Sequence, residues 1–205
     1  MKTRELGSDS IQHFLRPLHI NWMRSPYAVE ATAWTTRGQI EAALFFRGTI
    51  VSAHGYIETR LAELCFQCSR HPSYLNLRAD FPYYLQERIK YLRKVFALGP
   101  LVHYQSTAEC FLSRVEKQAE LRHLVAHARM EVSDWGATFH DFKAQKGQPI
   151  AYRSKRMTLK SLEHEAWNAA RLSRICQHLA SNLDSLGILP PLEDTYIESS
   201  SSGGA

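Results

Sequence analysis

The feature that most constrains the fold is a long helical pattern that runs without a proline from about Gln39 to Cys68. Apolar side chains recur along it at roughly the i, i+3, i+4, i+7 spacing of one helix face. This face comprises Ile40, Leu44, Val51, Ile57, Leu61, Leu64, Cys65 and Cys68. Because such a face must be buried against other elements, the pattern predicts packing of this helix within a larger domain.

Three further helical segments follow this one along the chain. They run from Asp80 to the Gly99-Pro100 stop, from about Thr107 to Met130, and from about Leu159 to Leu186. Gly187 suits the position after a helix end, where the backbone often turns left-handed. One β element is expected between the third and last helices. There, Ala137–Phe142 and Ile150–Ser154 flank the turn-prone Lys146-Gly147-Gln148-Pro149, which indicates a hairpin.

These elements predict an all-α protein, an antiparallel four-helix bundle with a β-hairpin inserted before the last helix. The 205 residues suit one domain with a real core. Residues 1–37 contain Pro17 and Pro26 and are expected to form an N-terminal arm packed on the helical domain, residues 38–190. The arm could cover a cleft, extend a dimer interface or dock a partner. The Ser- and Gly-rich tail, 191–205, is expected to be disordered.

The cellular compartment is suggested by what the sequence lacks. Met1–Glu5 precede no apolar segment of the kind that a secretory signal needs, and no window reaches eighteen apolar residues. Four cysteines at irregular spacing are typical of a reduced, cytoplasmic protein. The single Cys65-Phe66-Gln67-Cys68 lies within a helical pattern, so we expect buried thiols rather than zinc or redox chemistry.

Positive charge is concentrated around the predicted hairpin. The chain carries a net charge of +5, and residues 143–160 contain six basic residues and no acidic one. A local basic patch is what phosphate binding requires. The candidate RNA-binding residues are Lys143, Lys146, Arg153, Lys155 and Arg156. The alternative is a hairpin that its charges merely keep soluble. His140 could stack on a base, although a core-facing aromatic pair with a neighbouring phenylalanine is the simpler interpretation.

The candidate site is Arg122-His123-Leu124-Val125-Ala126-His127, near the end of the third helix. A histidine whose pKa is near 6.5 can exchange a proton with a ribose hydroxyl or a leaving oxygen near neutral pH. An arginine can hold a phosphate and stabilise its extra charge in the transition state. Arg122 and His127 are about 140° apart around an ideal helix and about 7.5 Å apart along it. Such chemistry needs no metal or cofactor, and no carboxylate cluster suggests one.

This string resembles the R-φ-x-x-x-H motif of the HEPN superfamily, in which φ is a polar residue, commonly Asn, Asp or His. The resemblance covers roughly residues 38–187. It implies a helical bundle that dimerises and brings two motifs into one cleft. It also implies metal-independent endoribonuclease activity of the toxin or anti-phage defence type, which leaves a 2′,3′-cyclic phosphate. Arg122 and His127 carry over as catalytic residues, His123 as the polar residue beside them, and Glu58 as the acid that orients the arginine.

The resemblance further implies a homodimer that acts on RNA, with no membrane association, and a neutralising antitoxin-type protein partner. One departure concerns the toxin branch that carries a tyrosine two residues after the histidine. Arg129 stands at that position here, which places in doubt both membership of that branch and silencing through that tyrosine.

Simpler structural roles remain open for each candidate residue. His123 and His127 could grip a metal as an i, i+4 pair, although no third ligand is evident nearby. Arg122 could form a structural ion pair with Glu58 or Glu120. Glu58 could equally be an ordinary surface residue.

Two other functions also fit the sequence. The first is a catalytically inactive HEPN-like module that binds nucleic acid or a protein, which the basic hairpin fits equally well. The second is a scaffold for dimerisation without RNA affinity. Because fold alone does not define function, the enzymatic prediction rests on the motif.

Overall fold

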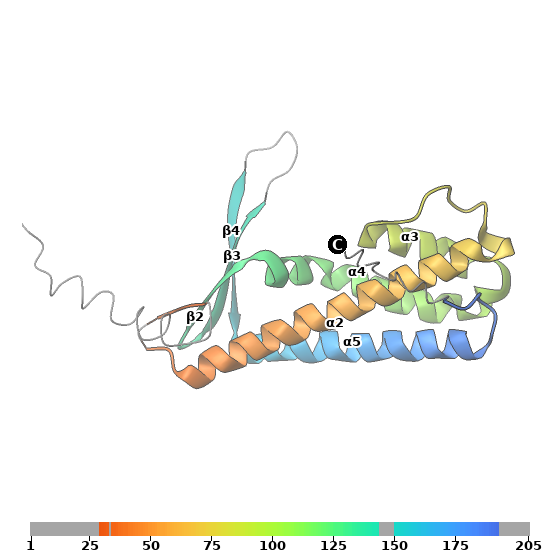
Figure 1. Cartoon of the computed structure of the whole chain (residues 1–205). Coiled ribbons are helices and arrows are strands. Elements are labelled where there is room, and N and C mark those ends of the chain that lie inside the picture. The colour runs from red at the N-terminus through yellow and green to blue at the C-terminus, as the bar shows by residue number, and fades with distance from the viewer. Residues whose placement is uncertain (1–28, 33, 144–149, 193–205) are drawn as a thin grey trace, which may run out of the picture. The chain divides into compact units, whose positions relative to one another are not determined.

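The computed structural model describes residues 29–32, 34–143 and 150–192 (Figure 1). Within these ranges it contains four α-helices: α2 (Arg37–Arg70), α3 (Leu85–Phe96), α4 (Gln105–His127) and α5 (Leu159–Ser185). Two short 3-10 helices are η2 (Pro72–Tyr74) and η3 (Gly99–Tyr104). Four strands complete the described chain: β1 (Glu30–Ala31), β2 (Arg129–Ser133), β3 (Gly136–Lys143) and β4 (Ala151–Thr158).

The expectation of an all-α four-helix bundle is wrong, because the described chain contains a substantial mixed sheet beside its helices. The strand order is β1-β2-β3-β4, with β1 parallel to β2 and the other pairs antiparallel. The expected hairpin corresponds to β3 and β4, which pair from Gly136 opposite Thr158 to Lys143 opposite Ala151. The expected third helix ends at His127 instead of Met130, and a further strand follows it.

Strand β2 was not predicted from the sequence, and the pattern of its side chains explains why these residues form a strand. Arg129 is exposed, Met130 is buried, Glu131 is half-buried and Val132 is buried. This period of two places alternate residues on opposite faces of a sheet, whereas a helix would bury residues three or four apart. The short turn at Asp134-Trp135 then returns the chain as β3.

The described chain forms two compact units. The first comprises the chain up to Ile57 together with Ser113–Ile175, and the second comprises Glu58–Leu112 together with the chain from Cys176. The first unit therefore holds the whole sheet, the first part of α2, the later part of α4 and most of α5. All the predicted site residues except Glu58 belong to this first unit.

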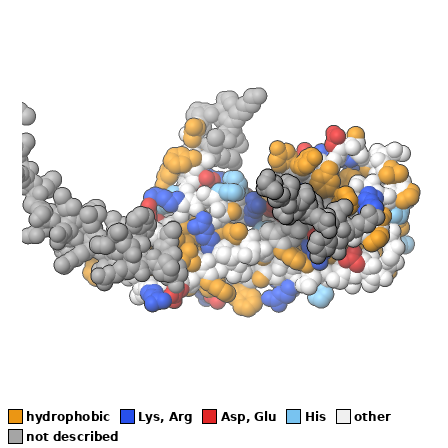
Figure 2. All heavy atoms as spheres, viewed as in Figure 1, with side chains coloured by type: hydrophobic (Ala, Val, Ile, Leu, Met, Phe, Trp, Pro, Cys, Tyr) orange, Lys and Arg blue, Asp and Glu red, His pale blue; other side chains and the backbone are white. Residues whose placement is uncertain are grey.

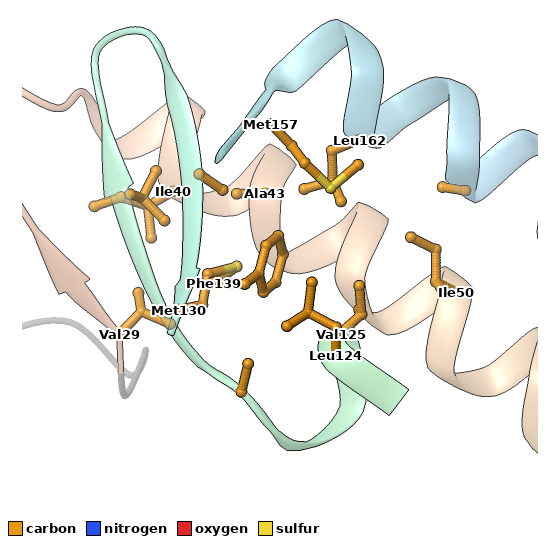
Figure 3. Close-up of a cluster of buried hydrophobic side chains, with 14 of the residues drawn as sticks. Val29, Ile40, Ala43, Ile50, Leu124, Val125, Met130, Phe139, Met157 and Leu162 are labelled. Atoms are coloured by element: carbon orange, nitrogen blue, oxygen red, sulfur yellow. The ribbon is translucent and has the colours of Figure 1, made fainter. Parts of the chain in front are cut away.

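The core of the first unit lies between one face of the sheet and its three helices (Figure 3). Phe139 of β3 is fully buried at the centre of the cluster. The helical contributions include Ile40 and Ile50 from α2, Val125 from α4 and Leu162 from α5. Burying a large apolar side chain contributes about 1.5–3 kcal/mol, so this cluster fixes the end of α4 against the sheet.

Alternation along the strands divides the sheet into a core face and a solvent face. Ala137, Phe139 and Met157 lie on the core face and are buried. His140, Phe142 and Tyr152 lie on the other face, where Phe142 is directly opposite Tyr152. α5 begins directly after β4, and the amide of Ser161, in its first turn, donates to the Thr158 hydroxyl at 3.1 Å. This is a side-chain cap of the usual kind.

The second unit has its own buried contacts. The hydroxyl of Tyr74 donates to the carbonyl of Leu98 at 3.2 Å and accepts from the amide of Leu101 at 3.3 Å. Cys65 and Cys68 are buried free thiols, as predicted from their position within a helix. Burial raises the pKa of the Cys65 thiol to about 12. This thiol is therefore protonated and a poor nucleophile near neutral pH.

Several predictions concern the two ends of the chain. Residues 1–28 and 193–205 lie outside the described ranges, so the N-terminal arm and the tail stay predictions, as do the boundaries 1–37, 38–190 and 191–205. Within the described ranges, Glu30 and Ala31 pair with Glu131 and Val132 of β2.

None of the helices in the described part is both long and apolar enough to span a bilayer.

Candidate functional site

The end of α4 is held in place by an arginine from α2. Arg47 is half-buried, and its Nε donates to the carbonyl of Val125 at 2.9 Å, while Nη2 donates to that of Ala128 at 3.1 Å. These carbonyls belong to the last turn of the helix and its continuation, where no intrahelical donor remains. A cation there is also favourable with the helix dipole. Arg47 thus fixes the backbone beside the predicted site.

His123 and His127 lie on one exposed face of α4, one turn apart. Their ring centroids are 4.9 Å apart and the ring planes are inclined by 50°. Both side chains are exposed, and His127 is the last residue of the helix. The structure therefore brings these two predicted residues together, as their i, i+4 spacing requires.

Arg122 has a different environment from the histidine pair. It is half-buried, and its charge acts on His54 of α2, which is only 1% exposed. Burial lowers the pKa of His54, and the nearby Arg122 charge lowers it further. The side chain of Gln118 partly opposes this pKa shift. However, neither ring nitrogen of His54 has a hydrogen-bond partner among the described residues. Arg122 therefore lies beside a buried polar group that the sequence alone did not single out.

Glu58, the predicted partner of Arg122, is half-buried and belongs to the second unit. Its backbone carbonyl accepts a hydrogen bond from Nη1 of Arg88 at 3.1 Å. Arg122 belongs to the first unit. The pairing of Glu58 with Arg122 stays a prediction.

A charged network links the hairpin to α4. Arg153 of β4 donates from Nη2 to Oδ2 of Asp141 at 2.9 Å and from Nη1 to Oε1 of Glu120 at 2.9 Å. The hydrogen bond from Arg153 lowers the pKa of Asp141, and the charge of His123 contributes less in the same direction. The network thus connects the part of the hairpin far from Gly136 and Thr158 with the helix face that carries the histidines.

The five candidate RNA-binding residues of the hairpin fall into three groups. Lys146 and the side chain of Lys143 lie outside the described residues. Lys155 and Arg156 are exposed. Arg156 lies over the ring of Trp135, with 5.7 Å between the guanidinium carbon and the ring centroid. Arg153 is half-buried and bound to the two carboxylates, so its role is at least partly structural.

A groove lies between α4 and β4, with a volume of about 360 Å³. Its walls are Lys117, Glu120, Leu121, Leu124, Arg153, Ser154 and Lys155. We refer to it as the α4–β4 groove. Its three basic side chains outnumber the one carboxylate, so it favours an anion. Figure 2 shows Lys and Arg side chains as separate patches among hydrophobic side chains on the face in view.

An aromatic strip on the solvent face of the sheet was not predicted in this form. It consists of His140, Phe142 and Tyr152. The His140 and Tyr152 rings stack with centroids 5.9 Å apart, and those of Phe142 and Tyr152 are 5.3 Å apart. His140 Nδ1 and the Tyr152 hydroxyl share a hydrogen bond. Phe142 is 68% exposed and Tyr152 is 56% exposed. His140 therefore belongs to a surface strip and not to a core-facing aromatic pair.

The described residues contain no group of three or more His, Cys, Asp or Glu side chains that could hold a metal ion. His123 and His127 could supply two imidazole ligands, whereas zinc sites in proteins ordinarily have three or four protein ligands. The donor set of the described chain thus gives no specific reason to assign a metal here.

Comparison of the chain with protein-family models, with curated proteins and with solved structures finds no match. The resemblance to the HEPN superfamily therefore rests on the residues from Arg122 to His127 and stays a prediction.

Proposed function

We propose that this chain is a metal-independent endoribonuclease. The observation that supports this most directly is the exposed pair of His123 and His127, with rings 4.9 Å apart. The α4–β4 groove supplies a cationic surface on the same helix. Acid–base catalysis requires a proton acceptor and a proton donor within reach of one phosphodiester. The exposed imidazole of His127 can act in both roles in turn, as a proton acceptor when it is neutral and as a proton donor once it is protonated.

The proposed reaction uses the 2′-hydroxyl of RNA as the nucleophile. His127 removes the 2′-hydroxyl proton as the 2′-oxygen bonds to phosphorus. The bond from phosphorus to the 5′-oxygen breaks, and His127, which now carries the proton taken from the 2′-hydroxyl, gives that proton to the leaving 5′-oxygen. The products are a 2′,3′-cyclic phosphate and a 5′-hydroxyl. Arg122 is assigned to the negative charge on the phosphate, and Glu58 to orienting Arg122. His123 is the polar neighbour of the base.

A second candidate function, a catalytically inactive nucleic-acid- or protein-binding module, is favoured by the environment of Arg122. Its charge acts on the buried ring of His54, which is the arrangement of a structural residue. A guanidinium held there contributes to catalysis only when it also reaches the phosphate. The two candidates differ in whether a folded protein cleaves RNA, so one assay separates them.

The deciding experiment is cleavage of mixed cellular RNA in EDTA by wild type, His127→Ala, His123→Asn and His178→Ala. We expect wild type and His178→Ala to leave cyclic-phosphate ends. His178 is exposed on α5 and is a matched control. His127→Ala should cleave at least about 100-fold more slowly, as loss of an acid–base group does. His123→Asn keeps a polar side chain and should retain more activity than His127→Ala.

Absence of cleavage by a folded wild type would favour the binding module, and equal cleavage by wild type and His127→Ala would refute the site. Cleavage that EDTA abolishes would refute metal independence.

The proposed enzyme is a cytoplasmic homodimer with a composite site, and a neutralising protein restrains it. A composite site supports complementation: Arg122→Ala and His127→Ala chains, each inactive alone, should regain cleavage when mixed, because a mixed dimer keeps one intact arginine and one intact histidine. Light scattering on the wild type checks the dimer directly. Failure of the mixture to regain activity would indicate that each chain works alone.

A further inference from the structure

A second hollow lies between α4 and α5, with a volume of about 270 Å³. Three of its lining residues are basic: Arg114 and Lys117 from α4 and Arg171 from α5. Two amides, from Gln118 and Asn168, also line it, and its apolar lining residues are Leu172 and Ile175. All these residues belong to the first unit. We refer to this hollow as the α4–α5 pocket.

Within the part of the chain that the structure describes, the three basic residues of the α4–α5 pocket have no paired charge. None of them has an ion pair or hydrogen bond with another residue in the described ranges. Three other arginines of the described chain form ion pairs: Arg93 with Glu109, Arg129 with Glu30, and Arg153 with two carboxylates. Arg114 and Lys117 are one helical turn apart, so they repel each other mildly. Like charges around a hollow without a counter-charge favour the binding of an anion.

The α4–α5 pocket adjoins the α4–β4 groove. Lys117 lines both hollows. The basic side chains therefore form a track from Arg171 through Arg114 and Lys117 to Lys155. Glu120 is the one carboxylate that lines the groove, and Arg153 pairs with it at 2.9 Å and with Asp141 at 2.9 Å, so these three groups together leave one negative charge against the four basic side chains of the track. The track as a whole keeps an excess of positive charge.

We propose that this track binds the phosphodiester backbone of single-stranded RNA, with Arg114, Lys117 and Arg171 as phosphate contacts. This inference rests on the proposed function, because the RNA is the strand that reaches the histidines. A single small anion would occupy one hollow, whereas two adjoining hollows with a shared lysine fit successive phosphates of a chain. Leu121, Leu124, Leu172 and Ile175 line the same hollows and provide apolar surface beneath sugars and bases.

The test is binding of a fluorescent single-stranded 2′-O-methyl RNA oligonucleotide, followed by anisotropy. This probe has no free 2′-hydroxyl, so it cannot be cleaved by the proposed reaction, and binding is measured independently of activity. The test variant is Arg114→Gln with Arg171→Gln. The matched control is Arg174→Gln with Lys90→Gln. These control residues are exposed, lie on α5 and α3, and do not line the track.

We expect the test variant to bind at least about 10-fold more weakly than wild type, and the control to bind within about 2-fold. The dependence of log affinity on log salt should also fall in slope by about 1.4, since each lost contact to a single strand releases about 0.7 fewer ions. Lys117→Gln alone should lower the slope by about 0.7 and gives an independent result should the double variant fold poorly.

Equal weakening in the test and control variants would overturn the proposal, because net charge alone would explain it. Unchanged binding would overturn it as well. A selective loss of binding in a protein that never cleaves unmodified RNA would retain the track and refute the ribonuclease. Cleavage of unmodified RNA by wild type, together with unchanged binding by the test variant, would retain the ribonuclease and refute the track.

Discussion

Arg153 of β4 lies directly opposite Asp141 of β3 and donates two hydrogen bonds to its Oδ2, at 2.9 and 3.1 Å. The same guanidinium reaches Glu120 of α4. A planar guanidinium suits such a bridge because its donors point in fixed directions. Arg153 therefore connects two strands with the helix that carries His123 and His127. Its position explains how a residue from a basic stretch in the sequence becomes a structural connection at the edge of the candidate site.

The first prediction concerns the pH dependence that Asp141 confers. The hydrogen bond from Arg153 lowers the pKa of Asp141 in the folded protein. The unfolded chain, with an ordinary carboxyl pKa of about 3.9, therefore takes up the proton first as the pH falls. The stabilisation is present above about pH 4 and is lost as the pH falls through the lower, folded pKa. Asp141→Asn should reduce the melting temperature at pH 7 modestly and by less at pH 3.

Thermal denaturation from pH 3 to pH 7 checks this, with Asp134→Asn as the control. Asp134 is exposed in the turn between β2 and β3. An equal loss of stability at pH 3 and pH 7 would contradict the role of the Asp141 carboxylate.

The second prediction concerns the turn that begins β3. Gly136 has a φ of +152°, and a Cβ at this position would lie 2.2 Å from the carbonyl oxygen of Met157. Because that oxygen belongs to the backbone of β4, Gly136→Ala requires the two strands to shift. We expect it to lower the free energy of unfolding by about 2–4 kcal/mol, in line with a severe core or backbone change. Urea denaturation measures this difference.

Gly48→Ala is the matched control for Gly136→Ala. Gly48 lies in α2, and a Cβ there would meet no atom within 4 Å. Since alanine is favoured over glycine within helices, Gly48→Ala should stabilise the protein by up to about 1 kcal/mol. A tolerated alanine at position 136 would show that the close contact with β4 can relax.

The helices could be predicted from the sequence because their apolar spacing and end signals are local. The ends of α3 and α5 lie close to their proline and glycine signals. The sheet was underestimated for a physical reason: β2 has five residues, and β1 has only two. Such short segments give weak periodic signals, and pairing with distant strands decides their structure. Arg129 and Met130 come just after a strong helical pattern, so the sequence pattern assigns them to the end of that helix instead of to a strand.

The candidate site was likewise predictable only where it depends on local spacing along one helix. The i, i+4 spacing of His123 and His127 guarantees that they share a face once α4 forms. Three features required the tertiary structure: the environment of Arg122 beside His54, the engagement of Arg153, and the pocket between α4 and α5. Arg114 and Arg171 are 57 positions apart in the sequence, and only helix packing makes them line one hollow.

The third prediction concerns His54. Burial lowers its folded pKa, and Arg122 adds to the shift. The unfolded chain, with an ordinary histidine pKa of about 6.5, therefore binds a proton more readily than the folded protein. Stability is retained above about pH 6.5 and falls as the pH decreases toward the folded pKa, by at most about 1.4 kcal/mol per pH unit. His54→Leu removes this proton uptake, so its stability relative to wild type should rise between pH 8 and pH 5.

Urea denaturation at pH 8, 6 and 5 measures the effect of His54→Leu. His178→Leu, at an exposed position on α5, serves as the control for replacing an imidazole by an apolar side chain. Parallel slopes for wild type and His54→Leu would contradict the assignment of a neutral, buried imidazole.

The last prediction concerns the aromatic strip on the solvent face of the sheet. Stacking of a base on an aromatic side chain contributes about 1–3 kcal/mol to binding of single-stranded nucleic acid. Tyr152 is stacked against His140 and lies beside Phe142, so its ring is already oriented. Tyr152→Ala should therefore weaken binding of single-stranded RNA by about 5- to 150-fold, whereas Tyr83→Ala, at an exposed tyrosine before α3, should not.

A second probe separates stacking from charge. An abasic oligonucleotide keeps its phosphates and lacks bases, so it should bind wild type and Tyr152→Ala equally. The same probe should still distinguish wild type from the Arg114→Gln and Arg171→Gln variant, because that difference depends on phosphate contacts. Weaker binding of the abasic probe by Tyr152→Ala would contradict base stacking and indicate that the substitution disturbs the hairpin.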